Sequence, residues 1–284
     1  MMDREHALAL RSQLFVPTLS SKFVAKAHTR GADAVIVDLE DAIAAHAKTA
    51  ARRALQSVTD EIAAQGMPVF VRINNDPNHL EADLEAAMAA RVVGIYLPKA
   101  EDPRQACAIA EALKGTPLAL VLLIESPMAV LRAAELASCS SRTVALVFGS
   151  EDYCAILGIR PGLEAMRIPA HAVALAARAY GLAAWGVTGT IAEFSDLEAF
   201  TAMAQASRDV GYTGALAIHP RQVAPLNTVF GVREEEAAEA AAIVEAFDAA
   251  MAEGRGAVAH NGRMLDLPIV ERARRVLALA RRGH

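Results

Sequence analysis

The feature that most constrains this chain is the alternation of eight short apolar runs with longer alanine-rich stretches. The runs lie at 14–17, 34–39, 69–74, 94–99, 119–126, 144–150, 183–189 and 215–220. Most of them are continuously apolar, which is typical of parallel strands that are covered on both faces. The stretches between them show helical spacing and predict helices at 20–30, 42–65, 79–91, 103–113, 127–137, 170–181 and 193–210.

Eight alternations of strand and helix predict an α/β fold, a (β/α)8 TIM barrel that spans residues 1–230. The structural alternative, a doubly wound sheet, usually has fewer strands and a glycine-rich first turn, and no GxGxxG motif follows an early run. After the eighth run come a long acidic helix at 234–253, a turn-rich segment at 254–268 and a helical segment at 269–282. We therefore expect a C-terminal helical extension at 231–284.

The bulk composition excludes several classes of partner. The net charge is −5, and no basic cluster is interleaved with aromatic residues, so we expect no nucleic acid partner. The longest apolar run, at 117–124, is far shorter than the roughly 20 residues that span a membrane, and the acidic start of the chain is unlike a signal peptide. Cys107, Cys139 and Cys154 form no CxxC pattern. We expect a cytoplasmic protein with reduced thiols.

Polar residues gather at the carboxyl ends of the predicted strands, where the active sites of these barrels lie. A polar residue at the end of an apolar strand is costly to bury unless it is paired or ligated. The barrel would bring these residues together at one mouth. They are Asp38, Glu40 and Asp41, then Arg72 and Asn74, then Lys99, Glu125, Glu151 and Asp152, and finally His219.

Two of these carboxylates predict a metal site. Glu125 and Asp152 end neighbouring strands and suit a hard divalent cation, Mg²⁺ or alternatively Mn²⁺, that keeps positions open for ligand oxygens. Arg72 would grip a carboxylate in bidentate fashion. Cation and guanidinium together would bind a 2-oxo or 2-hydroxy acid. The alternative is that the three residues form salt bridges at the rim of the barrel.

The remaining polar residues have plainer alternatives. Glu40 and Asp41 either hold water around the metal or are ordinary charges at a helix N-terminus. Lys99 could be a Schiff-base lysine, although the carboxylate pair favours a metal. His219, before a proline, is more often a structural cap than a ligand. The serines before Lys22 suit phosphate binding or simple N-capping.

Ordered motifs give the chain a resemblance to a known family. It resembles the citrate lyase β-subunit-like family, which includes malyl-CoA and citramalyl-CoA lyases, within the HpcH/HpaI aldolase superfamily. The motifs run in order along the chain: RSQLFVP (11–17), VDLEDA (37–42), VRIN (71–74), LPKAE (97–101), IES (124–126), FGSEDY (148–153), AIHPRQV (217–223) and LDLP (265–268).

The resemblance implies a Mg²⁺-dependent carbon–carbon lyase, usually a homotrimer. Such an enzyme cleaves or forms a 3-hydroxyacyl-CoA thioester from a 2-oxo acid and acetyl-CoA. Carried over by motif, Glu125 and Asp152 would be the metal ligands. Arg72 would bind the acid's carboxylate, and Glu40 would lie near the metal's water.

The resemblance also implies how coenzyme A binds. Arg11 and Lys22 would lie on the path of its phosphates. Asp266, in the extension, would reach a neighbouring subunit's site and handle the proton of the acetyl methyl group. The chain departs from the family pattern at Thr18, Trp185 and Ala215, positions that bear on the acyl group and the CoA contacts.

Three functional interpretations stay open at this point. The first is the CoA-thioester lyase, which becomes a thioesterase where water captures the thioester. The second is a pyruvate-dependent aldolase that acts on free aldehydes and needs no Asp266. The third is a citrate lyase β-like subunit that works inside a complex. The sequence leaves open which acyl-CoA and which 2-oxo acid are used, and in which direction the reaction runs.

Overall fold

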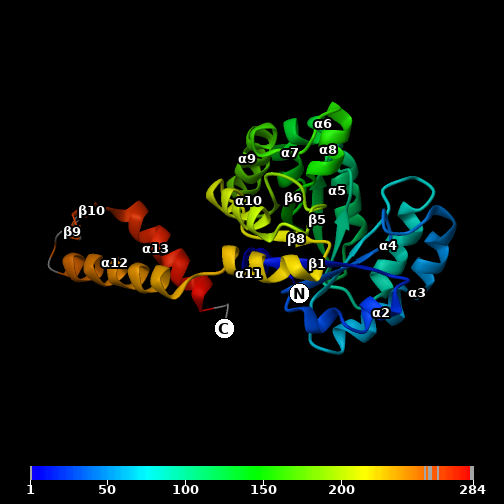
Figure 1. Ribbon diagram of the computed structural model, residues 1–284, viewed down its shortest axis with the longest axis horizontal. Coiled ribbons are helices and arrows are strands. Elements are labelled where there is room, and N and C mark those ends of the chain that lie inside the picture. The colour runs from blue at the N-terminus through cyan, green and yellow to red at the C-terminus, as the bar shows by residue number, and fades with distance from the viewer. Residues whose placement is uncertain (1, 253, 255–257, 261, 282–284) are drawn as a thin grey trace. The chain divides into compact units, whose positions relative to one another are not determined.

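The computed structural model describes all residues except 1, 253, 255–257, 261 and 282–284. The chain divides into two compact units, Met1–Val229 and Phe230–His284. The first unit contains an eight-stranded parallel sheet with helices around it, and the second contains two helices and a two-stranded hairpin (Figure 1). Each unit is described by itself.

The eight expected strands all form. They are β1 (Ser12–Pro17), β2 (Ala34–Asp38), β3 (Val69–Arg72), β4 (Gly94–Leu97), β5 (Ala119–Ile124), β6 (Thr143–Phe148), β7 (Ala183–Gly186) and β8 (Ala215–Ala217). Their order is β7-β6-β5-β4-β3-β2-β1-β8. Backbone hydrogen bonds from Gly186 N to Gly214 O (3.1 Å) and from Thr213 N to Ala184 O (2.8 Å) join β7 to the segment before β8. The predicted (β/α)8 barrel is therefore confirmed.

The helices of the first unit differ from the prediction in detail. They are α1 (Arg4–Ala9), α2 (Ser21–Val24), η1 (Ala27–Arg30), η2 (Ala45–Ala47), α3 (Lys48–Ala63), α4 (Leu80–Ala89), α5 (Pro103–Ala112), α6 (Pro127–Leu131), α7 (Ala133–Ser138), α8 (Ser150–Leu157), α9 (Leu163–Ala179), α10 (Leu197–Asp209), η3 (Pro220–Gln222) and α11 (Val223–Phe230). The single helices expected at 20–30, 42–65 and 127–137 are interrupted; the last one breaks at Arg132, where φ is −102° and ψ is 10°.

Helix α8 was not expected, and it matters most for the site. It begins directly after β6 and Gly149, so Glu151 and Asp152 stand in its first turn. Carboxylates are favoured there because the helix N-terminus carries a partial positive charge. An apolar strand thus runs into two acids because the chain turns at once into a helix at the mouth of the barrel.

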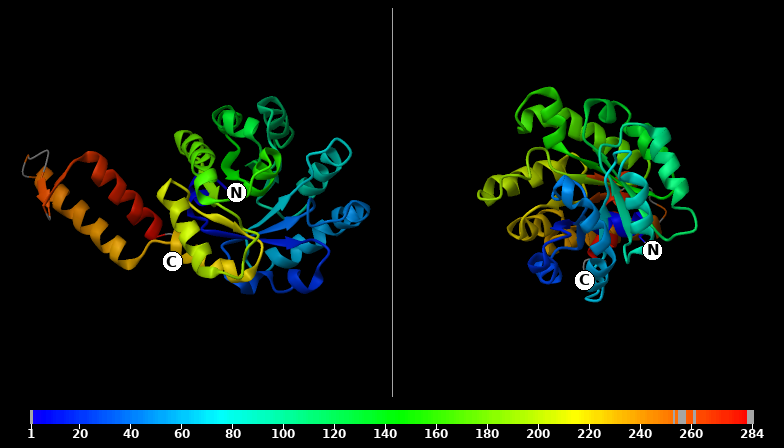
Figure 2. Two further views of the ribbon diagram at one scale, coloured as in Figure 1. Left: turned by 45° about the horizontal axis from the view of Figure 1, so that its top comes forward. Right: turned by 90° about the vertical axis from the view of Figure 1, so that its right-hand side faces the viewer.

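The inside of the barrel is filled by aromatic side chains. Tyr96 and Trp185 stack with ring centroids 6.2 Å apart, and Phe70 meets them edge-on at 5.4 Å and 6.3 Å. All three side chains are fully buried. Below them α1 covers the amino end of the barrel, with Ala7 in the same apolar cluster. Figure 2 shows the helices of the first unit surrounding the strands. The inside of the barrel is thus a packed core, and the cavity described below lies at its carboxyl end.

The second unit consists of α12 (Glu234–Ala252), the antiparallel strands β9 (Val258–His260) and β10 (Arg263–Leu265), and α13 (Leu267–Ala280). Phe247, Leu265 and Val270 form its small apolar core. The turn-rich segment of the sequence is thus a hairpin between two helices. Within the described residues no helix is both long and apolar enough to cross a lipid bilayer.

Closure of the barrel depends on Gly214, and this gives a stability prediction. A Cβ at Gly214 would collide with the backbone oxygen of Leu10 and would lie 3.0 Å from that of Arg11. Backbone cannot move aside cheaply, so Gly214→Ala should destabilise the fold by about 1–3 kcal/mol. Gly162 has open space around a Cβ and an extended backbone, φ −151°, so Gly162→Ala should stay within about 0.5 kcal/mol. Urea unfolding of both variants checks this, and equal midpoints would contradict it.

Candidate active site

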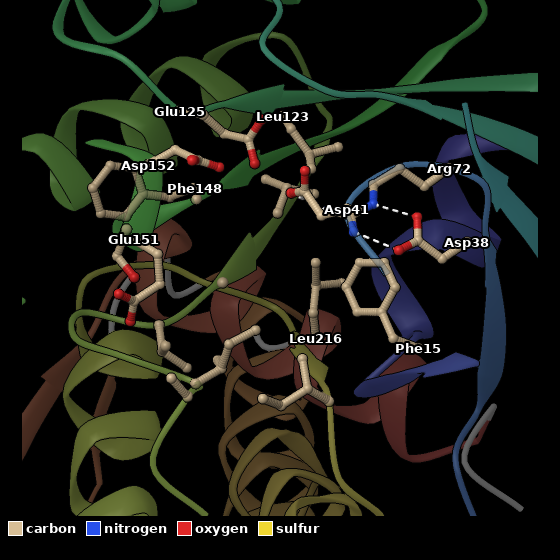
Figure 3. Close-up of a pocket in the computed structure, with 18 of the residues that line it drawn as sticks. Phe15, Asp38, Asp41, Arg72, Leu123, Glu125, Phe148, Glu151, Asp152 and Leu216 are labelled. Carbon is tan, nitrogen blue, oxygen red and sulfur yellow. Dashed lines mark hydrogen bonds and ion pairs between the residues drawn. The ribbon is translucent and has the colours of Figure 1, made fainter. Parts of the chain in front are cut away.

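The mouth of the barrel holds a cavity of about 360 Å³ between β1, β2, β3, β5, β6, β7 and β8. Charged and apolar side chains occupy different parts of its wall (Figure 3). Arg72 and Asp38 lie on one side, and Glu125 and Asp152 lie across from them. The structure therefore brings together at one cavity the arginine and both carboxylates that the sequence singled out.

Arg72 is held by a buried ion pair. Its Nε and Nη2 donate to the two carboxylate oxygens of Asp38, both at 2.7 Å, and the two residues are register partners on adjacent strands. Burial alone would raise the pKa of Asp38, but the hydrogen bonds and charge of Arg72 outweigh it and hold that pKa below its usual value. The guanidinium carbon also lies 4.7 Å from the centre of the Phe15 ring.

This pairing occupies part of the guanidinium of Arg72. Asp38 takes the Nε N–H and one N–H of Nη2, which leaves the second N–H of Nη2 and both N–H groups of Nη1. The expected bidentate grip on a ligand carboxylate stays a prediction. The remaining nitrogen, Nη1, lies 3.2 Å from Glu40 and 3.7 Å from Asp41. Nη1 is the donor that faces the acidic side of the mouth.

Glu125 is a buried carboxylate that follows β5. It is 5% exposed, and one oxygen accepts a hydrogen bond of 2.7 Å from the backbone N–H of Lys99. Burial, together with the nearby negative charge of Asp152, raises the pKa of Glu125 to about 7, although the hydrogen bond from the Lys99 N–H lowers it in part. Gly149 leaves room for it, because a Cβ there would lie 2.5 Å from Glu125 Cγ.

Asp152 approaches Glu125 from α8 and lies beside two cavities. It lines the 360 Å³ cavity together with Arg72, and also a second, more polar cavity of about 850 Å³. Glu125 lines both as well. Glu151, which precedes Asp152 in the chain, accepts a hydrogen bond from Thr190. The carboxylate pair therefore stands where the two cavities adjoin.

Glu40 and Lys99 pair on the polar side of the mouth. Lys99 Nζ donates to Glu40 Oε1 at 2.6 Å and lies 3.8 Å from Asp41. Burial alone would lower the pKa of Lys99, but the hydrogen bond and charge of Glu40 outweigh it, so its pKa is raised. A Schiff-base lysine must be deprotonated to react. The environment of Lys99 favours the charged form and disfavours the Schiff-base interpretation.

The loop that carries Glu40 is fixed by residues to which the sequence analysis gave no role. Lys48 Nζ donates to the carbonyl oxygens of Leu39 (3.3 Å) and Glu40 (3.0 Å) and to Asn74 Oδ1 (2.6 Å). Asn74 in turn donates to the buried Asp83. Asn74 was visible at the end of a predicted strand, but Lys48 and Asp83 lie inside helices and carry no local signal.

Three expected site residues do not line these cavities. Arg11 precedes β1 and pairs at 2.7 Å with Asp33, which precedes β2, so it lies at the amino end of the barrel, and its expected role in CoA binding stays a prediction. Lys22 is exposed in α2, after β1. Asp266 belongs to the second unit, where it caps α13 by accepting from Ile269 N at 3.3 Å.

His219 and the departures from the family pattern have structural roles. His219 Nδ1 accepts from Arg221 N at 3.2 Å, and its ring stacks on Phe194 at 4.4 Å, so it acts as a cap. Thr18 is buried and its hydroxyl donates to the Asp38 carbonyl oxygen at 2.5 Å. Trp185 is buried in the barrel core and Ala215 begins β8. Neither of these two lines the mouth.

The residues present fit a hard divalent cation. Glu125 and Asp152 offer two carboxylates, and a cation would offset the cost of their adjacent negative charges. Glu40 Oε2 is buried and, although it is near Arg72, has no aligned hydrogen bond. Within the described residues no three His, Cys, Asp or Glu side chains are grouped closely enough to hold a metal alone. The donor set suits Mg²⁺, which commonly takes one or two carboxylates and completes its shell with water and ligand oxygens.

Known proteins resemble this chain along most of its length. A citrate lyase subunit beta-like protein of Deinococcus radiodurans is 36% identical, covering 95% of this chain and 96% of that protein. A (3S)-malyl-CoA thioesterase of Cereibacter sphaeroides is 35% identical, covering 95% and 94%. The solved structure of CitE from Mycobacterium tuberculosis with magnesium, acetoacetate and coenzyme A has a TM-score of 0.77 at 29% identity, covering 95% and 97%.

The family model for HpcH/HpaI aldolase/citrate lyase matches residues 11–220. That range includes all eight strands of the barrel, and it contains Arg72, Glu125 and Asp152. Sequence motifs, barrel and family model agree. This chain belongs to the HpcH/HpaI aldolase/citrate lyase family.

Proposed function

We propose that the protein is a Mg²⁺-dependent carbon–carbon lyase that cleaves or forms a 3-hydroxyacyl-CoA thioester of the malyl-CoA or citramalyl-CoA type. Its products in the cleavage direction are a 2-oxo acid and acetyl-CoA. The observation that carries the proposal is the buried Glu125 and the half-buried Asp152 across one small cavity from Arg72. Relatives named for citrate lyase and malyl-CoA, and a structural neighbour solved with magnesium and coenzyme A, support it.

The carboxylate pair would hold the cation. Glu125 and Asp152 each supply an oxygen, and the backbone N–H of Lys99 fixes the orientation of Glu125. Bound there, Mg²⁺ supplies Lewis-acid chemistry, because it polarises nearby oxygens and lowers the pKa of a hydroxyl group. Glu40, with one buried oxygen that lacks an aligned hydrogen bond, is available to a water molecule or a substrate hydroxyl.

Arg72 would orient the acid. Asp38 holds the guanidinium plane in place, so Nη1 can donate one charge-assisted hydrogen bond to the substrate carboxylate. Nη1 lies 3.2 Å from Glu40 and 3.7 Å from Asp41, so the substrate carboxylate would bind beside these two acids. Arg72 then neutralises one charge of the substrate and sets which carbon faces Glu125.

The reaction breaks one carbon–carbon bond. The hydroxyl proton would pass to a base, for which Glu40 is available. The carbonyl of the 2-oxo acid then forms, and the bonding electron pair passes to the thioester's α-carbon. Asp266 of a neighbouring subunit would then protonate that carbon, which gives acetyl-CoA; in the synthetic direction it would be the base. A positioned acid or base of this kind contributes about 10²–10⁴-fold. Because Asp266 would have to reach a neighbouring subunit, we also infer a homotrimer and a lid role for residues 231–284. The cytoplasmic location is inferred from the sequence alone.

A thioesterase is the second candidate, because one relative at 35% identity is named for malyl-CoA thioester hydrolysis. Hydrolysis needs only that water attacks the thioester carbonyl at the same site. The two activities give different products. Cleavage by the lyase leaves coenzyme A esterified, and hydrolysis releases its free thiol.

The first prediction here concerns the reaction itself. With Mg²⁺, the protein should release a 2-oxo acid and acetyl-CoA from malyl-CoA or citramalyl-CoA. The 2-oxo acid is measured as its phenylhydrazone, and acetyl-CoA is measured by chromatography. Removal of Mg²⁺ by chelation, or Asp152→Asn, should lower the rate by at least about 10²-fold. Asp266→Asn should block solvent-hydrogen exchange into the acetyl methyl group while Mg²⁺ binding persists. Release of free thiol without 2-oxo acid would replace the lyase by the thioesterase.

The second prediction concerns pH. The pKa of Glu125 is about 7, raised from an ordinary 4.5, so the metal-free protein should lose stability as pH rises from about 4.5 through 7. Mg²⁺ needs the deprotonated carboxylate. Calorimetry should therefore show its affinity falling about tenfold from pH 8 to pH 6. Glu125→Gln should abolish binding, and the exposed Glu111→Gln should keep the full pH response. An affinity that does not change between these pH values would refute the assignment of Glu125.

The third prediction separates the role of Arg72 from its ion pair. Lysine keeps the charge but loses the fork that pairs with Asp38, so Arg72→Lys should raise KM for the acid at least about tenfold. Arg11 makes a similar pair with Asp33 at the other end of the barrel. Arg11→Lys is the matched control and should leave KM for both substrates unchanged. If Arg11→Lys raised KM for CoA thioesters more than Arg72→Lys does, the role of Arg11 in CoA binding that the sequence predicts would be supported.

A further inference from the structure

Charged and apolar side chains line different parts of the 360 Å³ cavity. Its guanidinium and its carboxylates lie on facing sides (Figure 3). Its floor consists of Leu123, Val147 and Leu216, with Phe15 beside them. The three aliphatic floor residues are at most 6% exposed and belong to the apolar cluster that fills the barrel. The floor of the cavity is thus the top of the protein core.

The floor has no partner for a second charge. Among the described residues that line the cavity, Arg72 is the one basic side chain, and Asp38 already holds two of its nitrogens. The other charged lining residues are carboxylates. A second carboxylate on the ligand would be buried against hydrocarbon and near negative charge, without a hydrogen bond, which is strongly unfavourable.

The two cavities differ in what they can receive. The smaller one is near the lower limit of small-molecule sites, too small for coenzyme A. The adjoining cavity of about 850 Å³ is lined by polar groups that include Lys48, Asn75 and Lys99. Glu125 and Asp152 line both. A substrate bound at these carboxylates would therefore place its small acid half in the smaller cavity and its thioester half toward the larger one.

We infer that the acid half of the substrate is a monocarboxylic 2-oxo acid with an aliphatic tail of one or more carbons. This rests on the proposed function and narrows its substrate class. With its carboxylate at Arg72 and its oxo group toward Glu125 and Asp152, the tail of the acid points at Leu123, Val147 and Leu216. Glyoxylate has no tail to bury there, and oxaloacetate would bring a carboxylate.

Binding of a series of acids tests the inference. Dissociation constants of glyoxylate, pyruvate, 2-oxobutanoate, 2-oxopentanoate and oxaloacetate would be measured by calorimetry with excess free Mg²⁺ and again without it. The one methylene that 2-oxobutanoate has beyond pyruvate should tighten binding about fourfold. Oxaloacetate should bind at least about tenfold more weakly than 2-oxobutanoate.

Two leucine variants provide the matched comparison. Leu216→Ala deepens the floor and should shift the preference toward 2-oxopentanoate. Leu146, in β6 beside Val147, is fully buried and is not among the lining residues, so Leu146→Ala should leave the order of the acids unchanged. If Leu216→Ala does not fold, the series on the unmodified protein still decides.

The outcomes separate the two claims. Tighter binding with each methylene, in the presence of Mg²⁺, supports the inference. Glyoxylate or oxaloacetate binding as tightly as 2-oxobutanoate, with Mg²⁺ required, overturns the substrate class and leaves the proposed lyase standing. No Mg²⁺-dependent binding of any acid overturns both.

Discussion

The candidate site depends on one cross-strand ion pair. Asp38 and Arg72 are register partners at the ends of β2 and β3, and both are largely buried. Loss of one partner from a buried pair typically costs about 3–5 kcal/mol, because the other charge is left unpaired. The pair fixes the plane of the guanidinium. The Asp38 carboxylate also accepts hydrogen bonds from the backbone N–H groups of Glu40 and Ala42. The Thr18 hydroxyl donates to the backbone carbonyl oxygen of Asp38. One pair thereby sets the geometry of Arg72 and of the loop that carries Glu40.

An excess of carboxylates follows from this arrangement and explains the need for a cation. Asp38 neutralises Arg72, and Glu40 neutralises Lys99, so Glu125 and Asp152 are left facing each other without a basic side chain of their own. The pKa of Glu125 is raised mainly by burial, and the unbalanced negative charge of Asp152 adds to the rise. A divalent cation would relieve it, and the open coordination positions would then be available to the substrate. The protein's own charges therefore favour a cation between Glu125 and Asp152.

The sequence predicted the barrel well because continuous apolar runs are a strong signal for buried parallel strands. It also located Arg72, Glu125 and Asp152, since each stands at the end of such a run. It could not assign Asp38, one of three acids in VDLEDA, because only the register of β2 and β3 shows which acid meets Arg72. Arg11 precedes its strand, a position that places it at the amino end, and its expected role on the path of the CoA phosphates stays a prediction. Helix α8 was missed because eight residues with two acids carry little helical signal.

The most direct test of the central claim is the position of a metal ion in a crystal of the protein grown with Mn²⁺ and pyruvate, located by anomalous scattering. The account predicts one anomalous peak within coordination distance of both Glu125 and Asp152, with the pyruvate carboxylate toward Arg72 Nη1. A peak at Glu40 and Asp41 instead, or a pyruvate that binds away from Arg72, would contradict it.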